Sequence, residues 1–145
     1  MRSAWTAAWV AALLLASTGV EAADSPLRVR IRVLQGSRQG TPGVPPGLED
    51  LRGQLSSTAY VRWEQAGEVQ ASMLPRKPVS VALPGGESVT VTLVESRSGA
   101  STFEVSAPAS RTQSRVTVAP GKRIVQQVTV ERGGSAWFVT IRAGG

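Results

Sequence analysis

The chain of 145 residues contains no cysteine and no histidine. The absence of cysteine excludes a disulfide scaffold, a thiolate zinc site, a cysteine nucleophile and a lipid anchor attached to cysteine. The absence of histidine excludes a Ser-His-Asp triad. The chain is long enough for one domain, and we expect its stability to come from a packed core.

Aromatic residues are scarce, at 5% of the chain, and Asp and Glu number 10 against 16 Lys and Arg. Because the basic residues are dispersed and few aromatic rings are present to stack on bases, we expect no binding of nucleic acid. The carboxylates are not spaced as the pair that a glycosidase requires. The Gly-Gly pairs belong to turns, not to loops that cradle phosphate before a helix. We therefore expect no catalytic residue, no cofactor and no metal ion.

Long hydrophobic runs are also absent. The longest, at residues 7–16 (AAWVAALLLA), is much shorter than the roughly 20 residues of a transmembrane helix. A basic residue precedes this run, and Val20 and Ala22 suit the small-residue positions of a cleavage site. We therefore predict a signal peptide at residues 1–22 and a single mature domain at residues 23–145. The protein is expected to be periplasmic or extracellular, with no membrane span in the mature chain.

What the chain contains instead is regular alternation of apolar and polar residues. The clearest example is residues 79–95 (VSVALPGGESVTVTLVE), where two alternating runs flank a Pro-Gly-Gly turn. Successive side chains of a strand point to opposite faces, so this pattern predicts a β-hairpin with one buried face. About nine short runs of this kind, separated by Pro/Gly turns, predict an all-β fold, an antiparallel β-sandwich of the Ig-like or a related type.

The aromatic part of the chain gives two further expectations. Residues 58–64 (TAYVRWE) and residues 69–73 are predicted to be separate strands joined by a turn at residues 65–68. Trp63 and Trp137 are predicted to point inward from their strands and to be buried, because each alternates with polar or aliphatic neighbours.

A short helix is predicted between the first strand and this aromatic region. Leu48, Leu51 and Leu55 recur at helical spacing, so we expect the helix to lay its leucines on the sheet. Glu49 and Asp50 fall in its first turn, where negative charge suits the helix dipole. A cation site or an acid/base pair is the alternative role for these two carboxylates.

The segment before this helix, residues 35–47 (QGSRQGTPGVPPG), is rich in Gly and Pro and has no periodic pattern. We predict a long loop here. Loops of this length are often functional, although a solvated connection is the alternative.

The first strand carries the candidate binding residues. In residues 27–33 (LRVRIRV), aliphatic side chains occupy one face and Arg28, Arg30 and Arg32 occupy the other. Guanidinium groups bind phosphate and carboxylate bidentately, so this row is our candidate partner-binding site. We expect the strand to lie at a sheet edge and to pair with a strand of an acidic partner, which the arginines would steer. Alternatively, the charges serve only to prevent aggregation of an exposed edge.

The order of these features resembles that of a group of small exported bacterial proteins of uncharacterised function. A VRIRVL-like strand is followed by a Gly/Pro loop, a leucine-rich helix, an aromatic strand, an LPGG turn and a V-x-V-x-P-G hairpin. After the first strand, the motif residues are Pro46, Leu48, Leu51, Leu55 and residues 60–63, 83–86 and 116–121. The resemblance covers most of the mature chain and implies a β-sandwich-like fold, but it implies no catalytic residue and no ligand.

These observations predict a non-enzymatic exported module that binds or scaffolds in the envelope, as an accessory of a larger assembly. The formal charge of +6 favours an acidic protein or an anionic envelope polymer as the partner. Two alternatives remain open. One is a small carboxylate-dependent hydrolase of cell-wall glycan, and the other is a protease inhibitor that presents the loop at residues 35–47.

Overall fold

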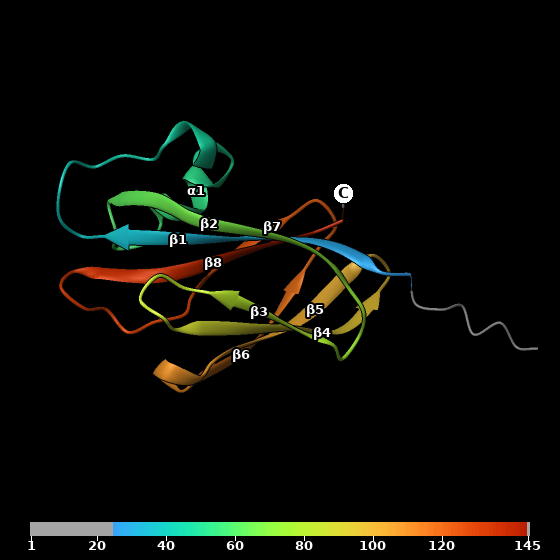
Figure 1. The fold of residues 1–145 in the computed structure, drawn as a ribbon. Coiled ribbons are helices and arrows are strands. Elements are labelled where there is room, and N and C mark those ends of the chain that lie inside the picture. Colours follow the sequence, from blue (N-terminus) through green and yellow to red (C-terminus); the bar gives the residue numbers. More distant parts are fainter. Residues whose placement is uncertain (1–24, 145) are drawn as a thin grey trace, which may run out of the picture.

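Two four-stranded sheets pack face to face in the computed structural model, which describes residues 25–144 (Figure 1). All pairings within the two sheets are antiparallel. The predicted antiparallel β-sandwich with one short helix is therefore confirmed, with eight strands in place of about nine. The predicted signal peptide, residues 1–22, lies outside the described residues, so it stays a prediction. Within the described part of the chain, no helix has the length and apolar character needed to cross a membrane.

The first sheet has the strand order β2-β1-β8-β7. Its strands are β1 (Leu27–Ser37), β2 (Arg62–Met73), β7 (Arg123–Gln127) and β8 (Ser135–Ala143). β1 pairs with β2 on one side and with β8 on the other, so it lies inside the sheet. A strand with two partners has no free backbone edge. The expectation that β1 is an edge strand, on which a partner strand would dock, is therefore wrong.

The second sheet has the order β3-β4-β5-β6. Its strands are β3 (Pro78–Ala82), β4 (Ser88–Arg97), β5 (Ala100–Ala107) and β6 (Thr112–Val118), and a 3₁₀ helix η2 (Pro108–Ser110) links the last two. The hairpin predicted at residues 79–95 is confirmed as β3 and β4, with Val81 opposite Val89.

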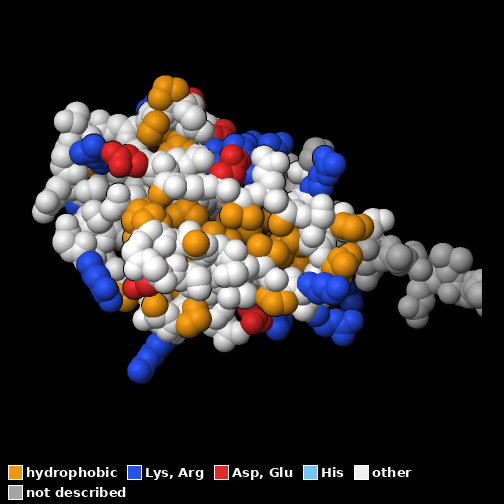
Figure 2. Space-filling view, in the orientation of Figure 1, with side chains coloured by type: hydrophobic (Ala, Val, Ile, Leu, Met, Phe, Trp, Pro, Cys, Tyr) orange, Lys and Arg blue, Asp and Glu red, His pale blue; other side chains and the backbone are white. Residues whose placement is uncertain are grey.

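The space between the sheets is filled by aliphatic side chains and Phe103. Val29, Ile31 and Val33 of β1 all belong to this core and are at most 3% exposed. Burying each such side chain contributes roughly 1.5–3 kcal/mol. Because side chains alternate along a strand, the arginines between these residues point to the opposite, outer face of the first sheet. Apolar side chains are visible along the seam between the two sheets (Figure 2).

A second apolar cluster lies on that outer face, beneath a helical segment. The 3₁₀ helix η1 (Pro46–Leu51) continues directly into α1 (Arg52–Ser56), and Leu48, Leu51 and Leu55 are at most 1% exposed. They pack with Leu34, Tyr60, Trp63, Ala136 and Phe138. The predicted helix and its buried leucines are confirmed. The segment stands over the C-terminal half of β1 (Figure 1).

The strand prediction for residues 58–73 is wrong. β2 is one continuous strand that pairs with β1 along its whole length. The pairing steps from Gly67 to Gln65 on β2, which leaves Ala66 as the extra residue of a β-bulge. The short polar segment Gln-Ala-Gly-Glu at residues 65–68, with its glycine, predicts a turn when it is taken alone. A bulge uses the same residue types without reversing the chain.

Each of the two tryptophans matches its prediction in one respect and departs from it in another. Trp63 is 2% exposed, but it is buried under the helical segment and not between the sheets. Trp137 packs against the core between the sheets while remaining only partly buried. The prediction of an inward face therefore fails for Trp63, and the prediction of full burial fails for Trp137.

Candidate functional site

Arginines from three neighbouring strands gather on the outer face of the first sheet. β1 contributes Arg28, Arg30 and Arg32, as the sequence predicts. The register places Arg142 of β8 opposite Arg30, and Arg123 of β7 opposite Arg142. Paired residues of adjacent strands project to the same face of a sheet, so the row along β1 is widened across β8 and β7.

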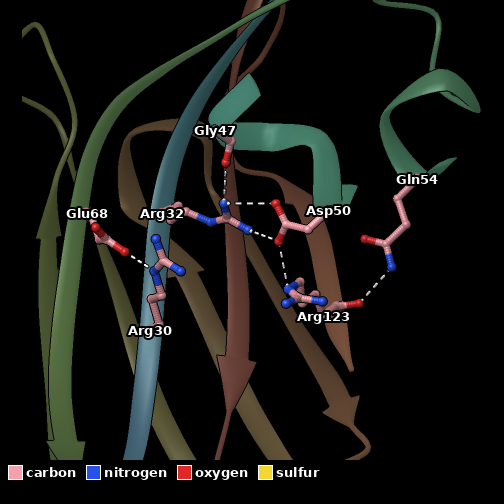
Figure 3. Close-up of polar contacts among 7 residues, drawn as sticks. All are labelled: Arg30, Arg32, Gly47, Asp50, Gln54, Glu68 and Arg123. Atoms are coloured by element: carbon pink, nitrogen blue, oxygen red, sulfur yellow. Dashed lines mark hydrogen bonds and ion pairs between the residues drawn. The ribbon is translucent and has the colours of Figure 1, made fainter. Parts of the chain in front are cut away.

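Arg32 is committed to the fold. Its side chain is 4% exposed. Its Nη2 donates to Oδ2 of Asp50 at 2.6 Å, and its Nη1 donates to Oδ1 of Asp50 at 3.3 Å and to the Gly47 carbonyl at 3.1 Å (Figure 3). These bonds fasten η1 to β1. Of the predicted binding residues, Arg32 is therefore a structural residue that an external partner does not reach.

The same carboxylate holds Arg123. Nε of Arg123 lies 2.8 Å from Oδ2 of Asp50, although the contact lacks the alignment of a hydrogen bond. Gln54 of α1 adds a bond of 2.8 Å to the Arg123 carbonyl (Figure 3). The hydrogen bond from Arg32 is the main cause that lowers the pKa of Asp50. Partial burial opposes this shift, and the charges of Arg32 and Arg123 reinforce it. Asp50 is thus an ionised bridge between the helical segment, β1 and β7.

Arg30 is only partly engaged. Its Nε donates to Oε1 of Glu68 on β2, and its side chain remains 41% exposed (Figure 3). The salt bridge uses one of the five N–H donors of the guanidinium group. The Nη atoms of Arg30 have no acceptor within residues 25–144.

Arg28, Arg30 and Arg142 line an open hollow of about 420 Å³. Gln70 and Ser72 of β2 contribute amide and hydroxyl groups to its wall, and no carboxylate lines it. Nε of Arg142 is buried and has no hydrogen-bond partner among the described residues. Arg28 makes no ion pair with any carboxylate in the same range of the chain. The hollow therefore brings together three guanidinium groups and has no carboxylate in its lining.

The contributions of Arg142 and Arg123 were not predicted from the sequence. Arg142 alternates with apolar residues in AWFVTIR, and this places it on the polar face of its strand together with Thr140. That signal marks an exposed arginine but does not identify its neighbours. Its position beside Arg30 depends on the pairing of the first strand with the last, which no local pattern specifies.

The carboxylates of the helix do not form a site. Oε1 and Oε2 of Glu49 each accept a bond of 2.7 Å from Arg52, on the surface of the helical segment. Asp50 faces Arg32 and Arg123. No group of three or more Asp, Glu, His or Cys side chains in the described range is placed to hold a metal ion. Neither carboxylate has the free surroundings that a cation site or an acid/base pair would require.

The loop predicted at residues 35–47 begins as the last part of β1 and is then anchored to β2. Gly43 donates to the Val61 carbonyl at 3.0 Å and accepts from the Trp63 N–H at 3.1 Å. Arg38 ion-pairs with Glu131, and its guanidinium carbon lies 5.0 Å from the centroid of the Tyr60 ring. The segment is thus tied to the sandwich at several points.

Comparison of the chain with models of protein families, with curated proteins and with solved structures gave no match. The resemblance to a group of small exported bacterial proteins therefore stays a prediction, and the candidate site rests on its geometry alone.

Proposed function

We propose that this protein is an exported, non-enzymatic binding module that captures an anionic partner, such as an acidic protein or an anionic envelope polymer. The observation that carries the proposal is the hollow lined by Arg28, Arg30 and Arg142, whose guanidinium groups meet no carboxylate in the lining. The signal-peptide pattern at residues 1–22 supports export, and it suggests that the protein meets its partner in the envelope.

The proposal replaces edge docking by binding on a sheet face. Arg28 and Arg30 stand on a strand fixed by partners on both sides, and Arg142 stands on the neighbouring strand. Side chains on such a rigid support lose less conformational freedom on binding than side chains on a loop. The charged groups would also attract an anionic partner before contact, and salt would weaken that attraction.

Two features of the surroundings support the same function. Under the helical segment, Asp50 contacts both Arg32 and Arg123 and offsets one of their two positive charges. In the hollow, Arg28 and Arg142 form no ion pair with any carboxylate of the described residues, so their charges are not offset there. Lys and Arg side chains are also seen above the first sheet in the space-filling view (Figure 2).

The absence of His and Cys from the whole chain fits binding better than catalysis, because it removes the commonest general base and the strongest side-chain nucleophile.

The test is a titration with two polyanions, polyphosphate and poly-L-glutamate, by calorimetry at about 0.05 M and 0.15 M salt. The double variant Arg28→Ser/Arg142→Ser should bind roughly tenfold or more weakly than the wild type, because it loses two charged donors. The matched control is Arg97→Ser/Arg115→Ser, which removes the same charge from the second sheet, where these side chains are 83% and 67% exposed. The proposal is wrong if neither polyanion binds, or if the control weakens binding as much as the double variant.

A further inference from the structure

We infer that the hollow is shaped for a phosphate group, so that the partner is a phosphate-bearing chain and not a polycarboxylate. The inference rests on the proposed function and names the chemistry of its ligand. Its basis is that three arginine side chains from two adjacent strands, β1 and β8, line the same hollow.

The register fixes the positions of these groups. Arg30 and Arg142 are directly paired across β1 and β8, and Arg28 follows on β1 two residues from Arg30 on the same face. Directly paired residues have Cβ atoms about 4.5–5.5 Å apart, and residues two apart in a strand are about 6.6 Å apart. Long arginine side chains span such distances, so all three groups reach one ligand in the hollow.

The number of donors favours an anion with several oxygens. A carboxylate has two oxygens in one plane, and a single guanidinium fork satisfies both. A phosphate monoester has three terminal oxygens in a tetrahedral arrangement and a charge of about −1.5 to −2 at pH 7. It therefore accepts bonds from several arginines at once.

The second wall of the hollow has neutral groups. Ser72 lies opposite Arg28 and Gln70 lies opposite Arg30 in the pairing of β2 with β1. Both side chains can donate hydrogen bonds to an anion without adding charge. Glu68 is the nearest carboxylate on β2, and its bond to Nε of Arg30 leaves the Nη atoms of Arg30 free for the ligand.

A flexible chain fits this face better than a lipid bilayer. The helical segment stands above the same face and would hold a flat surface away from the sheet (Figure 1). The only large hydrophobic side chains that are exposed in the described range, Val61 and Val130, do not line the hollow, so no apolar group there is placed to enter a bilayer.

The experiment compares four probes by calorimetry. They are a short linear polyphosphate (tripolyphosphate), poly-L-glutamate and dextran sulfate, all at equal concentration of charge, and vesicles of phosphatidylglycerol. We expect the polyphosphate to bind roughly tenfold or more tightly than each of the other three, because only its terminal groups combine three oxygens with a charge of about −1.5 to −2. The control variant Arg97→Ser/Arg115→Ser should keep this preference.

The variant Arg28→Lys/Arg142→Lys separates charge from geometry. Lysine keeps the positive charge but lacks the planar fork, so this variant should still bind polyanions and lose the preference for phosphate. An unchanged thermal unfolding midpoint shows that a variant is folded, and a variant that fails this check is replaced by the single substitution Arg142→Lys.

The outcomes distinguish the two proposals. Equal binding of polyphosphate and poly-L-glutamate overturns the phosphate inference and leaves the proposed function intact. Binding of dextran sulfate as tight as that of polyphosphate overturns it as well, in favour of any tetrahedral anion. Tighter binding to vesicles overturns the choice of a chain over a bilayer, and no binding to any probe overturns both the inference and the proposed function.

Discussion

Asp50 is the residue through which the helical segment is joined electrostatically to the sheet. Its carboxylate contacts Arg32, which is almost fully buried, and Arg123 on the other side of β8. A buried guanidinium group that loses its carboxylate leaves an uncompensated charge, and this costs more than the loss of an exposed ion pair. The position of this pair also decides which arginines remain available for binding.

The substitution Asp50→Asn should therefore destabilise the protein by about 2–4 kcal/mol. This is somewhat less than the roughly 3–5 kcal/mol that is usual for a buried pair, because Asp50 is itself 31% exposed. Urea unfolding followed by tryptophan fluorescence measures the change. Glu49→Gln is the matched control, since Glu49 and Arg52 form only a surface pair, and it should cost less than about 1 kcal/mol. Equal costs for the two substitutions would mean that the Arg32–Asp50 pair does not fasten the helix.

The pH dependence of the same pair has a definite sign. The pKa of Asp50 is lowered below its ordinary value of 3.8, chiefly by the hydrogen bond from Arg32. A carboxylate with a lowered pKa in the folded state contributes stability that is fully present above its ordinary pKa and is lost as the pH falls through the folded pKa. The stability difference between the wild type and Asp50→Asn should be constant from about pH 7 to pH 5 and should shrink below about pH 4. A difference that grows on acidification would contradict this linkage.

At the scale of the elements, the sequence predicts the presence of the helical segment, but it does not predict which face of the sheet that segment covers. The leucine spacing at residues 48–55 is local information, and the predicted helix is present. The side of the sheet that the helix covers is not local information. Trp63 is buried because the helix covers the outer face, whereas the alternation of its strand predicts only that one of the two faces is buried.

The leucines under the helix give a prediction about burial. Leu51→Ala should cost about 2–5 kcal/mol, because Leu51 is 1% exposed and its removal leaves a cavity. Trp137→Ala should cost less than a fully buried tryptophan, for which about 3–5 kcal/mol is usual, because Trp137 is partly exposed. Chemical unfolding of both variants tests the assignment. A larger loss of unfolding free energy for Trp137→Ala than for Leu51→Ala would contradict the assignment of Leu51 as the more completely buried residue.

The contact between β1 and β2 gives a second prediction at this scale. A Cβ atom added at Gly36 would lie 2.9 Å from the Trp63 ring, in the cluster beneath the helix. Gly36→Ala should therefore destabilise the protein by about 1–3 kcal/mol through overpacking. Gly67→Ala is the control, because a Cβ atom there meets nothing within 4 Å. Thermal unfolding should give a lower midpoint for Gly36→Ala than for Gly67→Ala. Equal midpoints would show that the aromatic side chains can move to accommodate the added methyl group without loss of stability.

At the scale of the whole molecule, the sandwich could be predicted and the strand order could not. Alternation in residues 79–95 specifies a hairpin between neighbours in the sequence, and that hairpin is present. The pairing of β1 with β8 joins opposite ends of the chain, and no local pattern encodes it. For this reason Arg28, Arg30 and Arg32 could be nominated from sequence. Three features could not be predicted in this way: the burial of Arg32, the pairing of Arg30 with Arg142, and the central position of β1 in its sheet.

The most direct test of anion binding in the hollow is a titration with tripolyphosphate observed by nuclear magnetic resonance at the Nε–H groups of the arginines. We expect the signals of Arg28, Arg30 and Arg142 to move together, because these side chains line the hollow. The signal of Arg32, which Asp50 holds under the helix, should stay in place. Shifts of similar size at Arg97 and Arg115 on the second sheet, or no shift at the three arginines of the hollow, would contradict the account.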